Sequence, residues 1–247
     1  MAEQGWSRPA GAPAKIYARE NGVVIRDVTP DLDNFVIEFM LEYFARDEPL
    51  NRSVQLTEDP DSLADLITIW NDVLPRRVSL VALAEGSPGS NLEPVSLSNP
   101  PTIMGANVLT VNCKSDKKST FLSQFSGAAF KKVGSLLSQI SSLENIFERY
   151  GVDHYLDAVG LSVAPISRGK GIGLMLLKAR IDLCRDLKIP LTKTIFTAIQ
   201  SQKLAAKVGF EVLQDKDYDE FKGPDGKVLF PDMAPTKSIQ LSVRTIP

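Results

Sequence analysis

The chain has 247 residues and a net charge of −2, with 43% hydrophobic and 23% charged residues. This ordinary globular composition gives no electrostatic reason to expect a nucleic acid or an acidic membrane surface as a partner. No apolar stretch approaches the roughly 18 residues of a membrane span, and the N-terminal residues lack the apolar core of a signal peptide. Cys113 and Cys184 cannot form a disulfide framework, so we expect free thiols in a cytoplasmic protein. His154 is the only histidine, which argues against a His-rich metal site.

The N-terminal part of the sequence predicts a disordered segment and then a hairpin. Residues 1–13 are rich in Gly, Pro and Ala and are expected to be disordered. This leaves residues 14–247 as a single domain. Residues 15–17 and 23–28 flank Glu20-Asn21-Gly22, a composition that favours a tight turn between two strands.

Helical periodicity follows the hairpin. Thr29-Pro30-Asp31 provides a capping residue and a proline of the kind tolerated in a first helical turn. The helix is predicted to end near Arg46, and Pro49 forces Glu48 out of the helical conformation. A second helix is expected to start after Thr57.

The remaining elements alternate between strands and helices. Strands are predicted at 77–85, 103–113, 155–164, 191–197, 210–213 and 238–243, and helices at 121–150, 172–187 and 199–208. The first of these helices is expected in two pieces separated near Gly134, and Gly209 is a C-terminal cap signal for the last. Alternation is clearest in the second half, which predicts an α/β (α+β) fold with a mixed central sheet covered by helices.

A glycine-rich turn joins the strand at 155–164 to the next helix. It reads Arg168, Gly169, Lys170, Gly171, Ile172 and Gly173. Glycines let backbone N–H groups approach a ligand, and a helix N-terminus adds N–H donors and a partial positive charge, so the turn suits a phosphate. A plain strand-to-helix turn that binds no ligand is the alternative. A dinucleotide fingerprint fails because its third glycine position is Leu174, and no P-loop sequence is present.

Four blocks of sequence together resemble the insect-type arylalkylamine (dopamine) N-acetyltransferases of the GNAT superfamily. They are YFARDEPLN at 43–51, LSVAPISRGKGIG at 161–173, TAIQSQKLAAKVGF at 197–210, and the tail around Phe230-Pro231 and Ala234-Pro235. The glycine turn is typical of GNAT proteins generally, whereas the DEPLN block is more specific to the subfamily. The resemblance implies a GNAT fold, with a mixed sheet splayed at the strand that binds the cofactor.

The resemblance also implies acetyl transfer from acetyl-CoA to a primary amine by direct attack in a ternary complex, without a metal. It gives Glu48 the role of general base, directly or through water, and places hydroxyl residues at Thr197 and Ser201. Thr197 stands where the family is expected to have serine. Ser201 has an alternative interpretation as a capping residue of the helix at 202–208.

Binding residues follow from the same resemblance. The cofactor would contact Leu161, Ser162, Val163, Arg168, Gly169, Lys170, Gly171, Ile172 and Gly173, and a backbone N–H near Val163 would stabilise the oxyanion. The amine pocket would involve Phe44, Glu48 and an insertion at 119–150. An aromatic residue at helical spacing such as Phe44 is more often part of the core. His154 is expected to be structural.

The resemblance does not specify which amine accepts the acetyl group. Dopamine, serotonin, tyramine and octopamine fit the family, whereas a polyamine or a protein or peptide amine would be a different acceptor class. A non-catalytic acyl-CoA-binding relative is a further alternative, against which the presence of Glu48 argues. We expect a monomer with a small-molecule amine substrate and no nucleic-acid or membrane partner.

Overall fold

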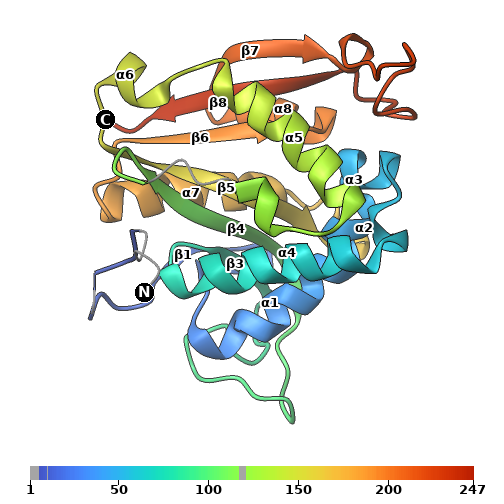
Figure 1. Cartoon of the computed structure of the whole chain (residues 1–247). Helices are drawn as coiled ribbons and strands as arrows, with labels where there is room; N and C mark the ends of the chain where they lie inside the picture. The colour runs from blue at the N-terminus through green and yellow to red at the C-terminus, as the bar shows by residue number, and fades with distance from the viewer. Residues whose placement is uncertain (1–5, 10, 117–120) are drawn as a thin grey trace.

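The computed structural model describes residues 6–9, 11–116 and 121–247, centred on an eight-stranded sheet (Figure 1). The strands are β1 (Ile16–Glu20), β2 (Val23–Asp27), β3 (Leu80–Ala84), β4 (Ile103–Cys113), β5 (His154–Val163), β6 (Leu191–Phe196), β7 (Glu211–Asp217) and β8 (Ser238–Thr245). Their spatial order is β1-β2-β3-β4-β5-β6-β8-β7. Among the described strands only β5 and β6 pair in parallel, so the predicted mixed sheet is confirmed.

Helices cover both faces of this sheet. They are α1 (Asp33–Phe39), α2 (Ala45–Asp47), α3 (Pro49–Ser53), α4 (Pro60–Val73), α5 (Ala128–Ser142), α6 (Ile146–Tyr150), α7 (Ile172–Asp186) and α8 (Ile199–Lys207). Figure 1 shows α4 and α5 in front of the sheet and α7 behind it. The core is divided accordingly, because α1 and α4 pack on one face of β3 and β4 while α7 packs on the other.

The N-terminal elements follow the sequence prediction closely. Asn21 and Gly22, with φ of 53° and 74°, form the turn of the β1–β2 hairpin. The first helix is continuous in direction from Asp33 to Asp47 but contains a π-helical turn over Met40–Phe44. Periodicity does not distinguish a single π-helical turn from α-helix, so this turn was not predicted.

Two helix predictions in the chain need correction. The helix predicted to break near Gly134 runs unbroken as α5, because buried side chains on both sides of Gly134 hold it against the core. The break falls instead at 143–145, where Asn145 caps α6 through its side-chain oxygen. The short helix α3 was not predicted, since five residues carry too little periodicity to identify a helix.

Part of the N-terminal segment expected to be disordered contacts the domain. Residues 1–5 and 10 lie outside the described part of the chain. Trp6 packs against the core on the α7 side, and Arg8 forms a 2.7 Å ion pair with the buried Asp27. These contacts fix the described part of the segment on β2.

Within the described residues, no helix combines the length and the hydropathy that a membrane span requires. The same residues contain no group of three or more His, Cys, Asp or Glu side chains able to hold a metal. Cys113 and Cys184 are both free thiols.

A gap opens between the two parallel strands. β5 and β6 pair only at Leu156 with Thr192 and at Asp157 with Lys193. Beyond these pairs β5 stays with β4, with a register shift at Val108–Leu109, whereas β6 pairs with β8 along its whole length. The sheet therefore has the predicted splay, beside the C-terminal half of β5.

Candidate active site

A cleft of roughly 2060 Å³ crosses the molecule at this gap. Its lining residues come from α4 and α5 on one side and from the sheet on the other, and they continue to the glycine turn before α7. Among the predicted site residues, it is lined by Phe44, Glu48, Leu161, Ser162, Val163, Arg168, Gly169, Gly171, Ile172, Gly173, Thr197 and Ser201. The fold thus brings together blocks far apart in the sequence. Lys170, the remaining predicted cofactor residue, is exposed within the turn.

Glu48 sits at the junction between the first helix and α3. Its backbone is extended, with φ of −64° and ψ of 129°, as the following proline requires. Its side chain caps α3, because Oε2 accepts a 2.7 Å hydrogen bond from the N–H of Asn51. Oε1 accepts a 2.6 Å hydrogen bond from the Thr197 hydroxyl. Both carboxylate oxygens are therefore held in place.

The surroundings of Glu48 make its carboxyl group a stronger base than an exposed glutamate. Burial raises its pKa, and the hydrogen bonds from Thr197 and Asn51 only partly oppose that effect. The side chain is half-buried because it faces the cleft, while protein surrounds it on its other sides. Removal from bulk water disfavours the ionised form, which is the physical cause of the shift.

The two hydroxyl residues differ in what they contact. Thr197 donates to Glu48, whereas Ser201 donates a 2.8 Å hydrogen bond to the carbonyl of Ala198 in its own helix. Helix α8 begins at Ile199 and its N-cap is Ala198, so Ser201 lies inside the first turn and is not the capping residue.

Tyr218 belongs to the same network, although no role was predicted for it. Its hydroxyl donates a 2.9 Å hydrogen bond to the carbonyl of Thr197. Burial, followed by the negative charge of Glu48, raises the pKa of Tyr218, so it stays protonated and remains a donor. A tyrosine at position 218 does not by itself indicate a hydrogen-bond partner 21 positions away in the sequence, so this contact needed the structure.

The glycine turn has the backbone conformation expected of an anion site. Gly169 and Gly171 have φ of 79° and 80°, and a Cβ at either position would meet nothing within 4 Å. The glycines are therefore required by the backbone conformation and not by packing. Gly171 is the N-cap of the 15-residue helix α7, whose first N–H groups have no partner within the helix.

Arg168 connects this turn to the helix that carries Glu48. Its Nε donates a 3.0 Å hydrogen bond to the Val163 carbonyl, and its Nη2 forms a 2.6 Å ion pair with Asp47. Arg168 and Asp47 are both partly exposed at the cleft. Surface pairs of this kind contribute little to stability, so the contact mainly sets the relative position of the two segments.

The backbone of β5 faces the gap where its pairing with β6 has ended. The Ala164 N–H donates a 3.0 Å hydrogen bond to the Met104 carbonyl, on the β4 side. Successive N–H groups along a strand point to opposite edges, so those of Val163 and Leu161 point toward the gap. They are available to a ligand in the cleft.

Phe44 packs against the core and also lines the cleft. Its ring packs edge-on against Trp70 with centroids 6.2 Å apart, and it also lines the cleft. A Cβ at Gly160 would come within 3.2 Å of the Phe44 ring. Glycine at this position therefore allows the first helix to lie directly on β5.

Solved structures of insect acetyltransferases share this fold, although no family model matches the chain. A protein of the yellow fever mosquito Aedes aegypti assigned as arylalkylamine N-acetyltransferase 7 is 32% identical, with a TM-score of 0.85, and the match covers 98% of this chain and 100% of that one. Arylalkylamine N-acetyltransferase 2 of Aedes aegypti is 23% identical over 92% and 100%, with a TM-score of 0.78.

A third solved structure has the same fold at lower identity. The polyamine N-acetyltransferase of Drosophila melanogaster, an enzyme that catalyses the formation of N-acetylagmatine, is 20% identical over 91% of this chain and 100% of that one, with a TM-score of 0.70. At the level of identity and coverage shown by the first of these relatives, the chain belongs to the insect arylalkylamine N-acetyltransferases of the GNAT superfamily.

Proposed function

We propose that this protein transfers the acetyl group of acetyl-CoA to the primary amine of a small arylalkylamine of the dopamine, serotonin, tyramine or octopamine type. The observation that supports this most directly is the Glu48–Thr197 pair, which faces the same cleft as the glycine turn and the free edge of β5. One cleft then contains a half-buried candidate base, a set of backbone donors and a candidate anion site.

The residues present fit acetyl-CoA. Open space around Gly169 and Gly171, together with the N-terminus of α7, suits a pyrophosphate. Lys170 and Arg168 add positive charge beside it. The edge of β5 at Leu161, Ser162 and Val163 suits the amide-containing arm of the cofactor, which Ile172 and Gly173 would flank.

Glu48 would act as the general base. An alkylamine resembles lysine, with a pKa of roughly 10, so it arrives as an ammonium ion. Glu48 accepts one proton from it, directly or through water, and the raised pKa of Glu48 makes this transfer more favourable. Thr197 donates to Oε1 and leaves Glu48 oriented toward the cleft.

Acetyl-CoA would supply the thioester, whose carbonyl carbon forms a bond to the amine nitrogen while the C–S bond breaks and the sulfur leaves with a second proton of the amine. The Val163 N–H, pointing into the gap, would stabilise the negative charge on the carbonyl oxygen. The Thr197 and Ser201 hydroxyls line the same cleft, and either would donate to the sulfur only after rotating away from its present acceptor, which is Glu48 for Thr197 and the Ala198 carbonyl for Ser201.

A polyamine acceptor is the second candidate function. It is favoured by carboxylates at the end of the cleft away from Glu48, where Asp72, Asp116 and Asp157 are among the lining residues. A carboxylate is a typical partner of the distal ammonium of a polyamine.

The test is release of free thiol from acetyl-CoA in the presence of tyramine, dopamine, serotonin, octopamine, spermidine or agmatine. We expect rapid turnover of at least one arylalkylamine. Turnover confined to spermidine or agmatine would favour the second candidate. Silence across the panel, with CoA still raising the melting temperature, would contradict the proposed acceptor class while retaining the cofactor site.

A further inference from the structure

The acceptor side of the cleft continues well beyond Glu48. Lys193 and Ile195 alternate along β6 and Thr197 follows directly after its end, so the three side chains continue along the same side of the sheet. All three line the cleft, and four residues of extended chain span about 13 Å. This length accommodates an aminoethyl chain and one aromatic ring, with the amine at Glu48 and the ring pointing toward Lys193.

The cleft changes character along this direction. Next to Glu48 its walls are apolar, with Phe44, Val159, Leu137 and Ile195. At the far end lies a polar cluster that we call the distal subsite, formed by Asn112, Ser141, Asp157 and Lys193. The amine end is therefore followed by an apolar middle and a polar end, which is the pattern of a ring that carries a polar substituent.

Hydrogen bonds hold the distal subsite in one arrangement. The Lys193 ammonium donates to Asp157 Oδ2 at 2.9 Å and to the Ser141 hydroxyl at 3.0 Å. Asn112 donates to Asp157 Oδ2 at 3.1 Å, and the Ala158 N–H donates to Oδ1 at 2.9 Å. An ammonium has three donors, and these contacts among the described residues use two of those on Lys193.

The buried charge of this region is positive. The side chains of Lys193 and Asp157 are only 5% and 14% exposed. Burial lowers the pKa of Lys193, but its electrostatic interactions with Asp157 and Tyr155 and its hydrogen bond to Asp157 outweigh that effect and raise the pKa overall. The ammonium lies 6.0 Å from the centroid of the Tyr155 ring. Arg180, fully buried on the other face, donates a 2.7 Å hydrogen bond to the Lys193 carbonyl. Burial lowers the pKa of Arg180 to about 10, so it remains charged at neutral pH.

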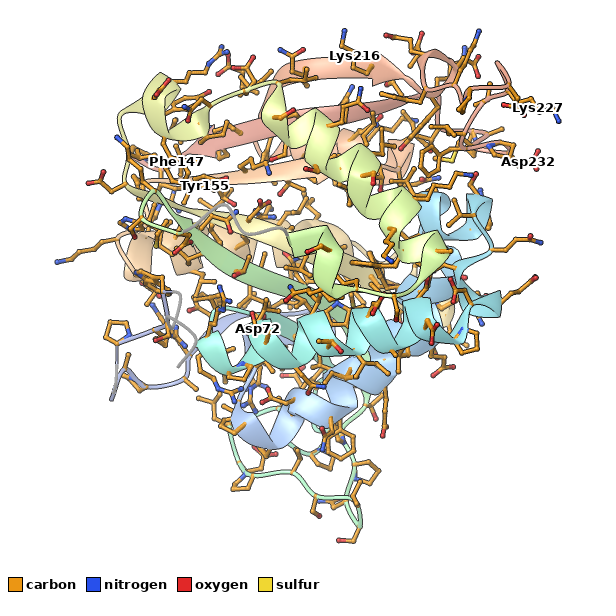
Figure 2. The ribbon with its side chains drawn as sticks, in the orientation of Figure 1. Asp72, Phe147, Tyr155, Lys216, Lys227 and Asp232 are labelled. Atoms are coloured by element: carbon orange, nitrogen blue, oxygen red, sulfur yellow. The ribbon has the colours of Figure 1, made fainter. Side chains whose placement is uncertain are left out.

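The two exposed carboxylates nearest the distal subsite do not cancel this excess. Asp72 is 68% exposed and already paired with Arg76 at 2.6 Å, and Asp116 is exposed. Figure 2 shows Asp72 at the outer end of α4, on the same side of the view as Tyr155 of β5. Exposed charges are screened by water and salt far more than buried ones. Around the distal subsite, the described residues therefore include two buried cations, Lys193 and Arg180, and one buried carboxylate, Asp157.

We propose that Lys193 determines acceptor specificity: its remaining N–H donates to the ring hydroxyl of a hydroxylated arylalkylamine, and its charge disfavours acceptors with a second cation. The inference rests on the proposed acetyltransferase function and selects between its two candidate acceptor classes. A site built to hydrogen-bond a hydroxyl discriminates strongly against the analogue that lacks it, because the buried donor then stays unpaired.

The test compares kcat/KM for tyramine, for phenethylamine, which lacks the hydroxyl, and for agmatine, which has a second cation. In the native protein we expect tyramine to exceed phenethylamine by about tenfold or more and to exceed agmatine by a larger factor. Lys193→Gln should bring the tyramine-to-phenethylamine ratio close to one and raise agmatine relative to both.

Ser141→Ala provides a milder variant that keeps the buried ion pair. It removes one of the two groups that orient Lys193, so the ratio should fall several-fold without loss of the fold. Ser142→Ala on the exposed side of the same helix and Lys178→Gln on the exposed side of α7 are the matched controls, and both should retain the native ratios.

Each result decides a separate point. Turnover of arylalkylamines with equal rates for tyramine and phenethylamine, or a ratio unaltered in both Lys193→Gln and Ser141→Ala, would overturn the role of Lys193 and leave the proposed function intact. A native preference for agmatine would overturn the exclusion of a second cation. No turnover of any amine would instead contradict the proposed function on which the inference rests.

Discussion

Pro49 defines the candidate base at the level of single residues. It ends the first helix, holds Glu48 in an extended conformation and starts α3, whose Asn51 N–H then binds the carboxylate. The sequence was sufficient to place Glu48 outside the helix, because the effect of proline on the preceding residue is local. The contact with Thr197 joins residues 149 positions apart and needed the structure.

Replacement of Glu48 by glutamine tests its role as a base. Glutamine keeps the shape, but its single amide oxygen can accept only one of the two hydrogen bonds that Thr197 and Asn51 donate to Glu48, and it cannot take a proton from the amine. We expect kcat to fall by about 10²- to 10⁴-fold. The native kcat should rise with pH through the raised pKa of Glu48, and this step should disappear in the variant. Steady-state kinetics across pH measure both effects.

The same variant, Glu48→Gln, should also change how the stability of the protein depends on pH. The pKa of Glu48 is higher in the folded state than in the unfolded chain, so the folded state binds more protons between the two pKa values. Stability is therefore lost as pH rises through that interval, so the melting temperature of Glu48→Gln relative to that of the native protein should be higher at pH 8 than at pH 4. Glu38→Gln on the exposed side of α1 is the control. A native kcat in the variant, or a difference in melting temperature between variant and native protein that is the same at pH 4 and pH 8, would contradict the assignment.

The contacts of other site residues could not be predicted from the sequence either, because they too join residues far apart along the chain. Thr197 and Ser201 were equal candidates as hydroxyl donors, and only tertiary structure separates the one that contacts Glu48 from the one that contacts its own helix. Lys193 and Asp157 lie on strands predicted only as strands. Their pairing depends on the point at which β5 and β6 stop pairing, which the residues themselves do not reveal.

At the level of elements, local signals were reliable where the chain turns sharply. The β1–β2 turn, the start of α7 and the end of α8 at Gly209 all depend on a glycine or asparagine with positive φ, and all were predicted. Gly134 was misleading, because the helix propensity lost at one glycine, about 1 kcal/mol, is small beside the packing of a helix that buries Val133, Leu136 and Ile140.

The glycine turn before α7 supports a prediction with an internal control. Gly171 and Gly151 both have positive φ, 80° and 61°, with no atom within 4 Å of where a Cβ would lie, and Gly151 ends α6 outside the cleft. Valine at either position should therefore lower the unfolding free energy by a similar amount, about 1–2 kcal/mol. Only Gly171→Val also places a side chain in the candidate phosphate site, so its CoA affinity should fall at least about tenfold.

Calorimetric titration with CoA measures the affinity, and denaturant unfolding measures the stability. The comparison separates backbone strain from obstruction of the ligand, because both variants carry the strain and only one lies in the cleft. Equal CoA affinities for the two variants would place the phosphates elsewhere.

At the level of the whole molecule, the sequence predicted a mixed sheet but not its strand order. Chain order would put β7 next to β6, whereas the structure places β8 between them. The reason is long-range, since the last strand pairs with β6 on one edge and with β7 on the other. No local pattern encodes this double pairing.

The strand order makes the sheet two units joined at one place. β1–β5 and β6–β8 share only two directly paired positions, and the candidate cofactor site lies where they separate. A ligand in the gap would contact both units. CoA should therefore stabilise the whole molecule against unfolding, and not only one of the two units.

CoA at 100 times its Kd should add about 2.7 kcal/mol, which corresponds to roughly 5–10 °C for a chain of this size. We expect a single calorimetric transition that moves upward as a whole with CoA concentration. Two transitions of which only one moves would show that the ligand contacts one unit alone, which contradicts a site in the gap. An unshifted single transition at saturating CoA would contradict cofactor binding itself, because any ligand that binds only the folded state must raise its stability.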